Sequence, residues 1–146
     1  MSTIKEVSIS EKKGTRKINV PKVVLKEDFG VIGDAHAGRG DRQVSLLASE
    51  SIDKMKTKGL NVNAGDFAEN ITTEGIDLLS LKLGSKLKIG KESVLEISQI
   101  GKVCHSRCSI YYQAGDCVMP KEGVFARVVK GGTIKRGDKL EVISAS

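Results

Sequence analysis

The stretch that decides the fold of this chain is Leu83-Gly-Ser-Lys-Leu-Lys-Ile-Gly-Lys-Glu-Ser-Val-Leu-Glu-Ile-Ser-Gln-Ile100. Apolar residues alternate with polar ones on both sides of Gly90-Lys91, which predicts two strands joined by a tight turn. Arg136-Gly-Asp-Lys-Leu-Glu-Val142 repeats the start of this stretch: a Gly, a short polar residue and Lys-Leu precede a β-branched end. The repetition predicts another strand that begins with the same kind of turn.

Residue patterns typical of strands also occur before and after this stretch. Between them lies a single clear helix pattern. The helix pattern runs from Ser49 to Lys58, with Ser49 or Ser51 as its cap and Gly59 as its end. Sixteen glycines against two prolines suit the many tight turns of a β-rich chain. We therefore predict a mostly β fold: an antiparallel β-barrel with one or two short flanking helices. Besides the strand that ends at Ile89, the predicted strands lie at residues 4–10, 18–20, 23–25, 43–47, 94–100, 124–129 and 139–143.

The composition of the chain indicates which kinds of partner and which cellular compartment to expect. The chain carries 24 Lys and Arg against 18 Asp and Glu, a net charge of +6, but the lysines are spread along it rather than massed in one run. This pattern favours a solvated surface, with anionic partners as the alternative. Aromatic residues make up 3% of the chain, which disfavours nucleic-acid recognition by base stacking. No window approaches the ~18 apolar residues of a membrane span, and no apolar signal core follows Met1, so we expect a cytoplasmic protein without membrane association.

All three cysteines lie within residues 101–117, and three interpretations of this stretch are open. Cys104, His105, Cys108 and Cys117 could form a structural zinc site, although the spacing matches paired zinc motifs only in part. A Cys/His nucleophile is the second interpretation, but a histidine adjacent to its cysteine in a strand points to the opposite face. The third is a thiolate that binds a metal cofactor or carries sulfur. An odd number of cysteines in a reducing compartment argues against disulfides.

Charge and flanking residues distinguish the cysteines from one another. Arg107 beside Cys108, with Lys102 nearby, supplies positive potential that favours the thiolate. A free cysteine is most often a small buried apolar residue, and this interpretation suits Cys117, which precedes Val-Met, better than the two cysteines with polar neighbours.

Two glycine-rich stretches hold the other candidate site residues. Residues 33–42 contain His36 and Arg42 among three glycines and acidic residues, so backbone amides and a guanidinium could approach an anionic ligand. This stretch is neither a P-loop nor a dinucleotide-binding motif, and a loop with exposed charges is the alternative. Asn70 and Thr72 need hydrogen-bond partners if they are buried, which a ligand or the closing of turns could supply.

Taken in order, these motifs resemble the MOSC domain family, named after the C-terminal domain of molybdenum cofactor sulfurase, in its small stand-alone bacterial type. The resemblance covers residues 5–143, approximately, and predicts a single MOSC-like domain spanning residues 1–146. The matching motifs are Gly33-Asp-x-His36, Arg42-Gln-Val-Ser-Leu-Leu47, Glu69-Asn-Ile-Thr-Thr-Glu-Gly75, the Cys104–Cys108 stretch, and Gly123-Val-Phe-Ala-Arg127 with Gly131-Gly and Gly137-Asp.

The resemblance implies an association with the molybdenum cofactor, molybdopterin. In the amidoxime-reducing relatives a cysteine in a Ser-Arg-Cys-like context ligates molybdenum, and Ser106-Arg107-Cys108 matches it. Cys108 is therefore the expected metal ligand or persulfide carrier, with Arg107 favouring its thiolate. The same resemblance suggests that a set of further residues contacts the cofactor or supports the site: His36, Arg42, Asn70, Thr72, Cys104 and His105.

The chain also departs from its larger relatives. It has neither the pyridoxal-phosphate desulfurase domain of the cofactor sulfurases nor the extra N-terminal β-domain of the amidoxime reducers, and Ala68 stands where the latter have an Arg. We expect a molybdenum-cofactor-associated protein that binds molybdenum and molybdopterin or carries sulfur, in an accessory role beside cofactor-biosynthesis proteins. The alternatives are a zinc-stapled binding module and a molybdenum-dependent reductase of N-hydroxylated compounds.

Overall fold

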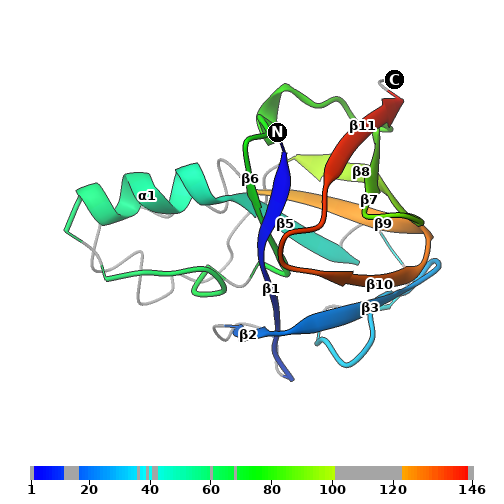
Figure 1. The fold of residues 1–146 in the computed structure, drawn as a ribbon, viewed down its shortest axis with the longest axis horizontal. Helices are drawn as coiled ribbons and strands as arrows, with labels where there is room; N and C mark the ends of the chain where they lie inside the picture. The colour runs from blue at the N-terminus through cyan, green and yellow to red at the C-terminus, as the bar shows by residue number, and fades with distance from the viewer. Residues whose placement is uncertain are drawn as a thin grey trace.

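The computed structural model describes residues 2–11, 17–35, 37–38, 40, 43–59, 61–67, 69–100 and 123–144. Strands dominate these residues, accompanied by one α-helix and one 3-10 turn (Figure 1). The elements in chain order are β1 (Thr3–Ile9), β2 (Ile18–Val20), β3 (Lys22–Lys26), β4 (Gly30–Val31), β5 (Val44–Ala48), α1 (Ser49–Thr57), β6 (Ile71–Glu74), η1 (Leu78–Ser80), β7 (Lys86–Ile89), β8 (Ser93–Ile100), β9 (Val124–Lys130), β10 (Gly132–Lys135) and β11 (Leu140–Ser144).

The strands form two sheets around one main core. The larger sheet has eight strands in the order β11-β7-β8-β9-β5-β6-β1-β2, and the smaller has three in the order β10-β3-β4. Both sheets contribute apolar side chains to the same buried cluster: Val23, Leu25 and Ile134 come from the smaller sheet, and Leu46 and Leu95 from the larger. Burial of these aliphatic side chains is the main favourable contribution to folding.

The hairpin predicted within residues 83–100 is confirmed. β7 pairs antiparallel with β8, and the chain turns at Gly90, whose φ of 64° suits glycine. Leu87 and Leu95, directly opposite each other, are buried in the core. The strand predicted from the repeated motif is β11, which adds to the other edge of β7.

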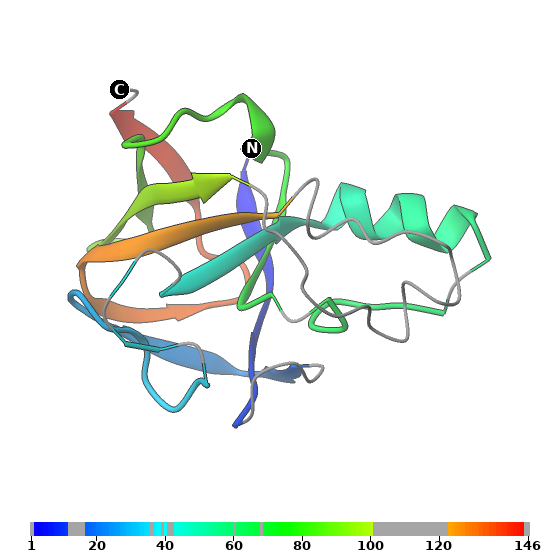
Figure 2. The same cartoon turned by 180° about the vertical axis from the view of Figure 1, so that it is seen from behind.

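The predicted helix is confirmed at its predicted position, but the prediction that Ser49 or Ser51 caps it is wrong. The chain passes from β5 directly into α1, so the N-cap is Ala48, which makes no side-chain capping bond. Ser49 and Ser51 are already helical and buried. Ile52 and Met55 pack in a second buried cluster, which among the described residues comprises Leu47, Ile52, Met55, Val62, Phe67 and Phe125. Figure 2 shows α1 extending sideways from the strands as a continuation of β5.

The mostly β class is confirmed, but the prediction of an antiparallel β-barrel is wrong in two respects. The eight-stranded sheet keeps two ends, β11 and β2, and a single bridge between Thr3 and Lys139 links β1 to β11. Closure needs a continuous ladder between end strands, and here β1 already pairs on both sides, with β6 and β2. In addition, β5 and β6 are parallel, because α1 and the residues after it carry the chain back along the sheet.

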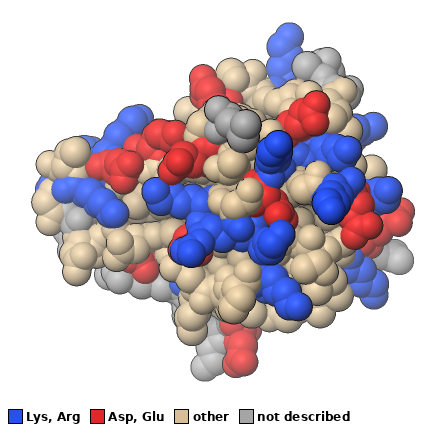
Figure 3. All heavy atoms as spheres, in the orientation of Figure 1, with Lys and Arg blue, Asp and Glu red and all other residues tan. Residues whose placement is uncertain are grey.

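Surface charges of both signs are interspersed on the face in Figure 3. Lys5 pairs with Glu74 at 3.1 Å and Lys135 with Asp138 at 3.0 Å. Among the described residues, no helix is both long enough and apolar enough to cross a membrane.

Candidate functional site

Most of the predicted site residues lie outside the described part of the chain. Asn70 and Thr72 are described, at the start of β6. The residues outside are His36, Arg42, Cys104, His105, Arg107 and Cys108, together with Ala68 and Cys117. The geometry of the site is therefore built from the elements that flank these residues.

The two ends of the cysteine-bearing stretch are placed by the larger sheet. Ile100, at the end of β8, pairs with Val124, at the start of β9. Val124 in turn pairs with Leu46 of β5, and Leu46 with Ile71 of β6. Since neighbouring strands are about 4.8 Å apart, this row of four spans roughly 15 Å. The ends of the stretch that holds Cys108 thus lie in the same row of the sheet as Ile71, which stands between Asn70 and Thr72.

Asn70 is fully buried and joins three strands. Its Oδ1 accepts from the backbone N–H of Ser45 at 3.0 Å and from the Ser45 hydroxyl at 3.2 Å. Its Nδ2 donates to the carbonyl oxygen of Ser8 at 3.2 Å. These bonds tie the start of β6 to β5 and β1. A contact between Asn70 and a cofactor remains a prediction, and the described bonds give this side chain a structural role as well.

Thr72 lies beside a buried acid that the sequence had not singled out. The Thr72 hydroxyl donates to Oε2 of Glu69 at 2.8 Å, and both residues are buried. Burial raises the pKa of the Glu69 carboxyl, although nearby backbone N–H groups and the Thr72 hydroxyl act in the opposite direction. Among the groups of the described residues, none is a hydrogen-bond partner of the other carboxylate oxygen, Oε1.

A buried ion pair anchors the first glycine-rich stretch. Lys17 Nζ lies 2.7 Å from Oδ1 of Asp34, and both side chains are 0% exposed. The same Asp34 oxygen accepts from the backbone N–H of Ser10 at 3.0 Å, and Ala35 N–H donates to the Ser10 carbonyl at 2.8 Å. Asp34 thereby holds the beginning of the Gly33-Asp-x-His36 motif against the end of β1.

Gln43 anchors the other end of that stretch. Its Oε1 accepts from the Val128 N–H at 3.0 Å, and its Nε2 donates to Asp28 at 2.9 Å. Together with Asp34, it fixes both ends of the segment that contains His36 and Arg42. The two described ends of this segment therefore lie against the end of β1 and against β9, both strands of the larger sheet.

Gly65 allows close backbone packing beside the ion pair. Its carbonyl accepts from the Lys17 N–H at 2.8 Å, its φ is +92°, and a Cβ there would lie 2.5 Å from the Lys17 carbonyl oxygen. Gly59 has a similar φ of +90° and open space around it. We predict that Gly59→Ala lowers the free energy of unfolding by about 1–2 kcal/mol through backbone strain alone.

Gly65→Ala is expected to cost about 1–3 kcal/mol more than Gly59→Ala, because a backbone oxygen cannot move away as a side chain can. Urea unfolding of the two variants measures the difference. Equal losses in both would show that the close approach of Gly65 to Lys17 does not constrain the fold.

The buried residues that the sequence analysis missed differ in how visible they were. Asp34, Ser45 and Glu69 stand inside the motifs quoted from the sequence, where only neighbouring residues were predicted to contact a ligand. Lys17 had no local signal, because nothing in a charged turn predicts a fully buried lysine.

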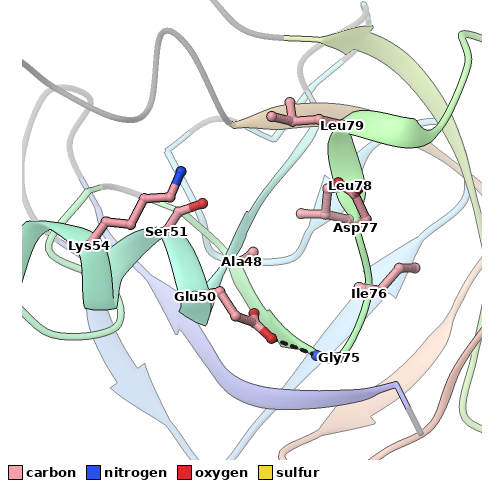
Figure 4. A pocket seen from close by; sticks show the side chains of 9 residues that line it. All are labelled: Ala48, Glu50, Ser51, Lys54, Gly75, Ile76, Asp77, Leu78 and Leu79. Carbon is pink, nitrogen blue, oxygen red and sulfur yellow. Dashed lines mark hydrogen bonds between the residues drawn. The ribbon is translucent and has the colours of Figure 1, made fainter.

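A separate pocket of about 390 Å³ lies where α1 begins and β6 ends (Figure 4). Oε2 of Glu50 accepts from the Gly75 N–H at 3.0 Å across it. Partial burial by itself would raise the pKa of Glu50, but this bond and other hydrogen bonds lower it overall. None of the predicted site residues lines this pocket, which is formed by Ala48, Glu50, Ser51, Lys54, Gly75, Ile76, Asp77, Leu78 and Leu79.

The described residues do not form a metal site by themselves. Within that part of the chain, no three His, Cys, Asp or Glu side chains are grouped so that they could hold a metal ion. The cysteines of the predicted metal or zinc site all lie outside it.

Solved structures share this sheet-dominated fold. A YuaD protein from Bacillus subtilis superimposes with a TM-score of 0.78 at 18% identity, covering 96% of this chain and 94% of that chain. YiiM from Geobacillus stearothermophilus gives 0.71 at 19% identity, covering 99% and 76%. YiiM from Escherichia coli gives 0.68 at 18% identity, covering 99% and 71%. At these identities the likeness shows a common fold.

The family follows from the sequence. The family model described as the MOSC domain matches residues 33–141, more than half of the chain. The chain therefore belongs to the MOSC domain family, which is associated with molybdenum-cofactor-related proteins. Comparison with curated proteins produced no match.

Proposed function

We propose that this protein binds molybdenum and its pterin through Cys108, or carries sulfur on that thiol as a persulfide, in an accessory role beside cofactor-biosynthesis proteins. The observation that carries the proposal is the row Ile100, Val124, Leu46 and Ile71, which brings both ends of the cysteine-bearing stretch to the buried polar residues of β6. Membership in the MOSC family supplies the class of ligand.

The residue types suit this ligand class. A soft thiolate such as that of Cys108 is a suitable ligand for molybdenum or for sulfane sulfur. Arg42 and Arg107 offer the planar guanidinium groups that bind phosphate, here the phosphate of the pterin. His36, Asn70 and Thr72 would complete the lining, with Cys104 and His105 as supporting residues.

One structural observation tests whether the described residues fit a polar heterocycle. The side-chain oxygen Oε1 of Glu69 is buried without a partner, directly beside Thr72. A buried polar atom of this kind is costly without a hydrogen bond, and a ligand with polar edges would supply one. This atom favours a polar partner, but Glu69 is fully buried, so a ligand would meet it only where the residues covering it move aside. The bound cofactor would supply a redox-active metal, while the chain binds and orients it.

The sulfur-carrier version of the proposal needs a persulfide donor. The Cys108 thiolate attacks the outer sulfur of the donor persulfide and forms a new S–S bond. The S–S bond of the donor breaks, and the donor leaves as a thiolate. Cys108 then holds one additional sulfur atom that can be passed to an acceptor.

Cys108→Ala is expected to abolish both loads without unfolding the protein. The measurement is molybdenum, pterin and the mass of the Cys108 peptide in protein purified from a molybdate-replete host. A persulfide adds ~32 Da, one sulfur on the capping chemistry of thiols. Cys117→Ala is the matched control and should keep the wild-type load.

Two results would contradict the proposal. Wild-type protein without molybdenum, pterin or an added sulfur would overturn it outright. Stoichiometric zinc, unfolding by a chelator and equal damage from alanine at Cys104, Cys108 and Cys117 would instead favour the zinc-stapled module.

A further inference from the structure

The pocket between the start of α1 and the turn after β6 is separate from the site of the proposed function. It has a volume of about 390 Å³, and none of the residues predicted to bind the cofactor lines it. A cavity of this volume lies in the range that holds small molecules in proteins. The chemistry of its walls indicates which class of molecule it fits.

One wall of the pocket is polar and carries charges of both signs. It belongs to α1, from which Glu50, Ser51 and Lys54 line the pocket. Residues four apart are neighbours on one face of a helix, so the Glu50 carboxylate and the Lys54 ammonium group are presented together. Figure 4 shows Lys54 and the Ser51 hydroxyl extending from α1 in the same direction. This wall therefore offers an acceptor and two donors to one ligand.

Glu50 is held in a fixed orientation on the polar wall. Its Oε2 accepts from the Gly75 N–H at 3.0 Å, and its Oε1 accepts from the Ser49 hydroxyl at 3.3 Å. Burial by itself would raise the pKa of Glu50, but hydrogen bonds lower it overall, so the carboxyl group is charged at neutral pH. A carboxylate has about four acceptor sites, so this one can accept a further donor from inside the pocket.

The opposite wall is mainly apolar. Ile76, Leu78 and Leu79 line it, and Asp77 adds a second carboxylate at its edge. Leu78 is 2% exposed and belongs to the main core, whereas Leu79 is 45% exposed. A single exposed leucine is common on protein surfaces. Here, however, the leucines face charged groups of α1 across a cavity (Figure 4), which suits a ligand with both apolar and charged parts.

We propose that this pocket binds a free α-amino acid with an aliphatic side chain. Lys54 and Ser51 bind its carboxylate. Glu50 accepts from its ammonium group, and Leu78 and Leu79 contact its side chain. An amino acid carries both charged groups on one carbon atom, which matches a donor and an acceptor that lie one helical turn apart. This site goes beyond the proposed function and does not depend on it.

Ligands with a single charge fit the pocket less well. A monoanion would meet the carboxylates of Glu50 and Asp77, and a monocation would meet the ammonium group of Lys54. Like charges at close range disfavour binding. A zwitterion gives each wall charge a partner of opposite sign.

Four small molecules test the three parts of this recognition. The probe is L-leucine, and each of the others lacks one part of it: isocaproate has no ammonium group, isoamylamine has no carboxylate, and glycine has no side chain. Isothermal titration calorimetry at neutral pH measures the dissociation constants with the full-length protein. We expect each of the three to bind at least about tenfold more weakly than L-leucine, because each loses one set of contacts.

Lys54→Met tests the position of the site, with Lys56→Met as the matched control. Both lysines are exposed on α1, but Lys56 does not line the pocket. Lys54→Met should weaken the binding of L-leucine about tenfold, and Lys56→Met should leave it unchanged. Leu79→Ser should also weaken binding, because it removes part of the apolar wall. All three variants should melt close to the wild-type temperature, since the substituted side chains are exposed.

Each outcome decides the matter. Preference for L-leucine over the other three molecules, weakened by Lys54→Met and not by Lys56→Met, supports the site. No binding of L-leucine at up to about 10 mM overturns the inference. Isoamylamine that binds as tightly as L-leucine would reveal a cation site and overturn it too, as would equal losses in the two lysine variants. None of these results bears on the molybdenum, pterin or persulfide content of the protein, so the proposed function is tested separately.

Discussion

Lys17→Met is expected to lower the free energy of unfolding by about 3–5 kcal/mol, because it removes the ammonium group at 2.7 Å from a fully buried carboxylate. Methionine keeps the apolar stem and a similar length, so the loss reports mainly on the missing charge. With total stabilities of about 5–15 kcal/mol for natural domains, such a loss is a large share. Urea unfolding followed by circular dichroism measures it.

The double variant Lys17→Met with Asp34→Leu tests the origin of that loss. Since it removes both charges together, it should recover much of the stability lost in the single variant. Lys135→Met is the surface control: the Lys135 side chain is 66% exposed in its pair with Asp138, so the pair should contribute less than about 1 kcal/mol. A single variant as stable as the wild-type protein would contradict the buried pair.

Asn70→Ala is expected to lower the free energy of unfolding by about 3–4 kcal/mol. It removes the acceptor of the Ser45 N–H and the donor to the Ser8 carbonyl, and each buried group that loses its partner costs about 1–3 kcal/mol. These bonds join three neighbouring strands, so the loss should be cooperative rather than confined to one loop. Thermal and urea unfolding both measure it.

Asn19→Ala provides the matched control for Asn70→Ala. Asn19 is exposed and accepts a single hydrogen bond, from the hydroxyl of the buried Ser8 at 2.7 Å, so its loss should cost about 1–2 kcal/mol, less than the loss at Asn70. If both alanine variants proved equally stable, the buried bonds of Asn70 would not hold the strands together. Its predicted contact with the cofactor would then become the better explanation for an asparagine here.

The sequence predicted the local elements of the fold well, for a physical reason. Apolar and polar residues alternate in β7 and β8 because each strand has one more buried and one less buried face. Such a pattern depends only on residues that are neighbours in the sequence. The same holds for α1, whose Ile52 and Met55 lie on one face of the helix. Turn glycines such as Gly90 complete the local pattern.

The arrangement of the sheets was predicted less well. Whether end strands join is decided by partners that are far apart in the chain, and here Thr3 and Lys139 form only a single bridge. The parallel pairing of β5 with β6 depends on how residues 58–70 return the chain. Alternation is the same in parallel and antiparallel strands of similar burial, so it could not reveal this.

The candidate site, like the fold, was predicted in part from the sequence and in part only seen in the structure. The family resemblance selected Asn70 and Thr72 as ligand contacts, and the structure adds their bonds to Ser45, Ser8 and Glu69. The roles predicted for Cys108 and the other residues of the cysteine-bearing stretch stay predictions. Glu69 was overlooked because a glutamate beside an asparagine carries no sign of burial in the sequence.

By itself, the sequence determined the β-rich class, the hairpin of residues 83–100, the helix after β5 and the family. These features depend on short-range patterns and on motifs that can be compared directly. Only the tertiary structure showed that Lys17 pairs with Asp34 and that Asn70 joins three strands. It also showed that Glu69 is buried with one oxygen that lacks a hydrogen-bond partner among the described residues. Burial and pairing of polar groups are properties of residues brought together from distant parts of the chain, where removal from water makes each partner decisive.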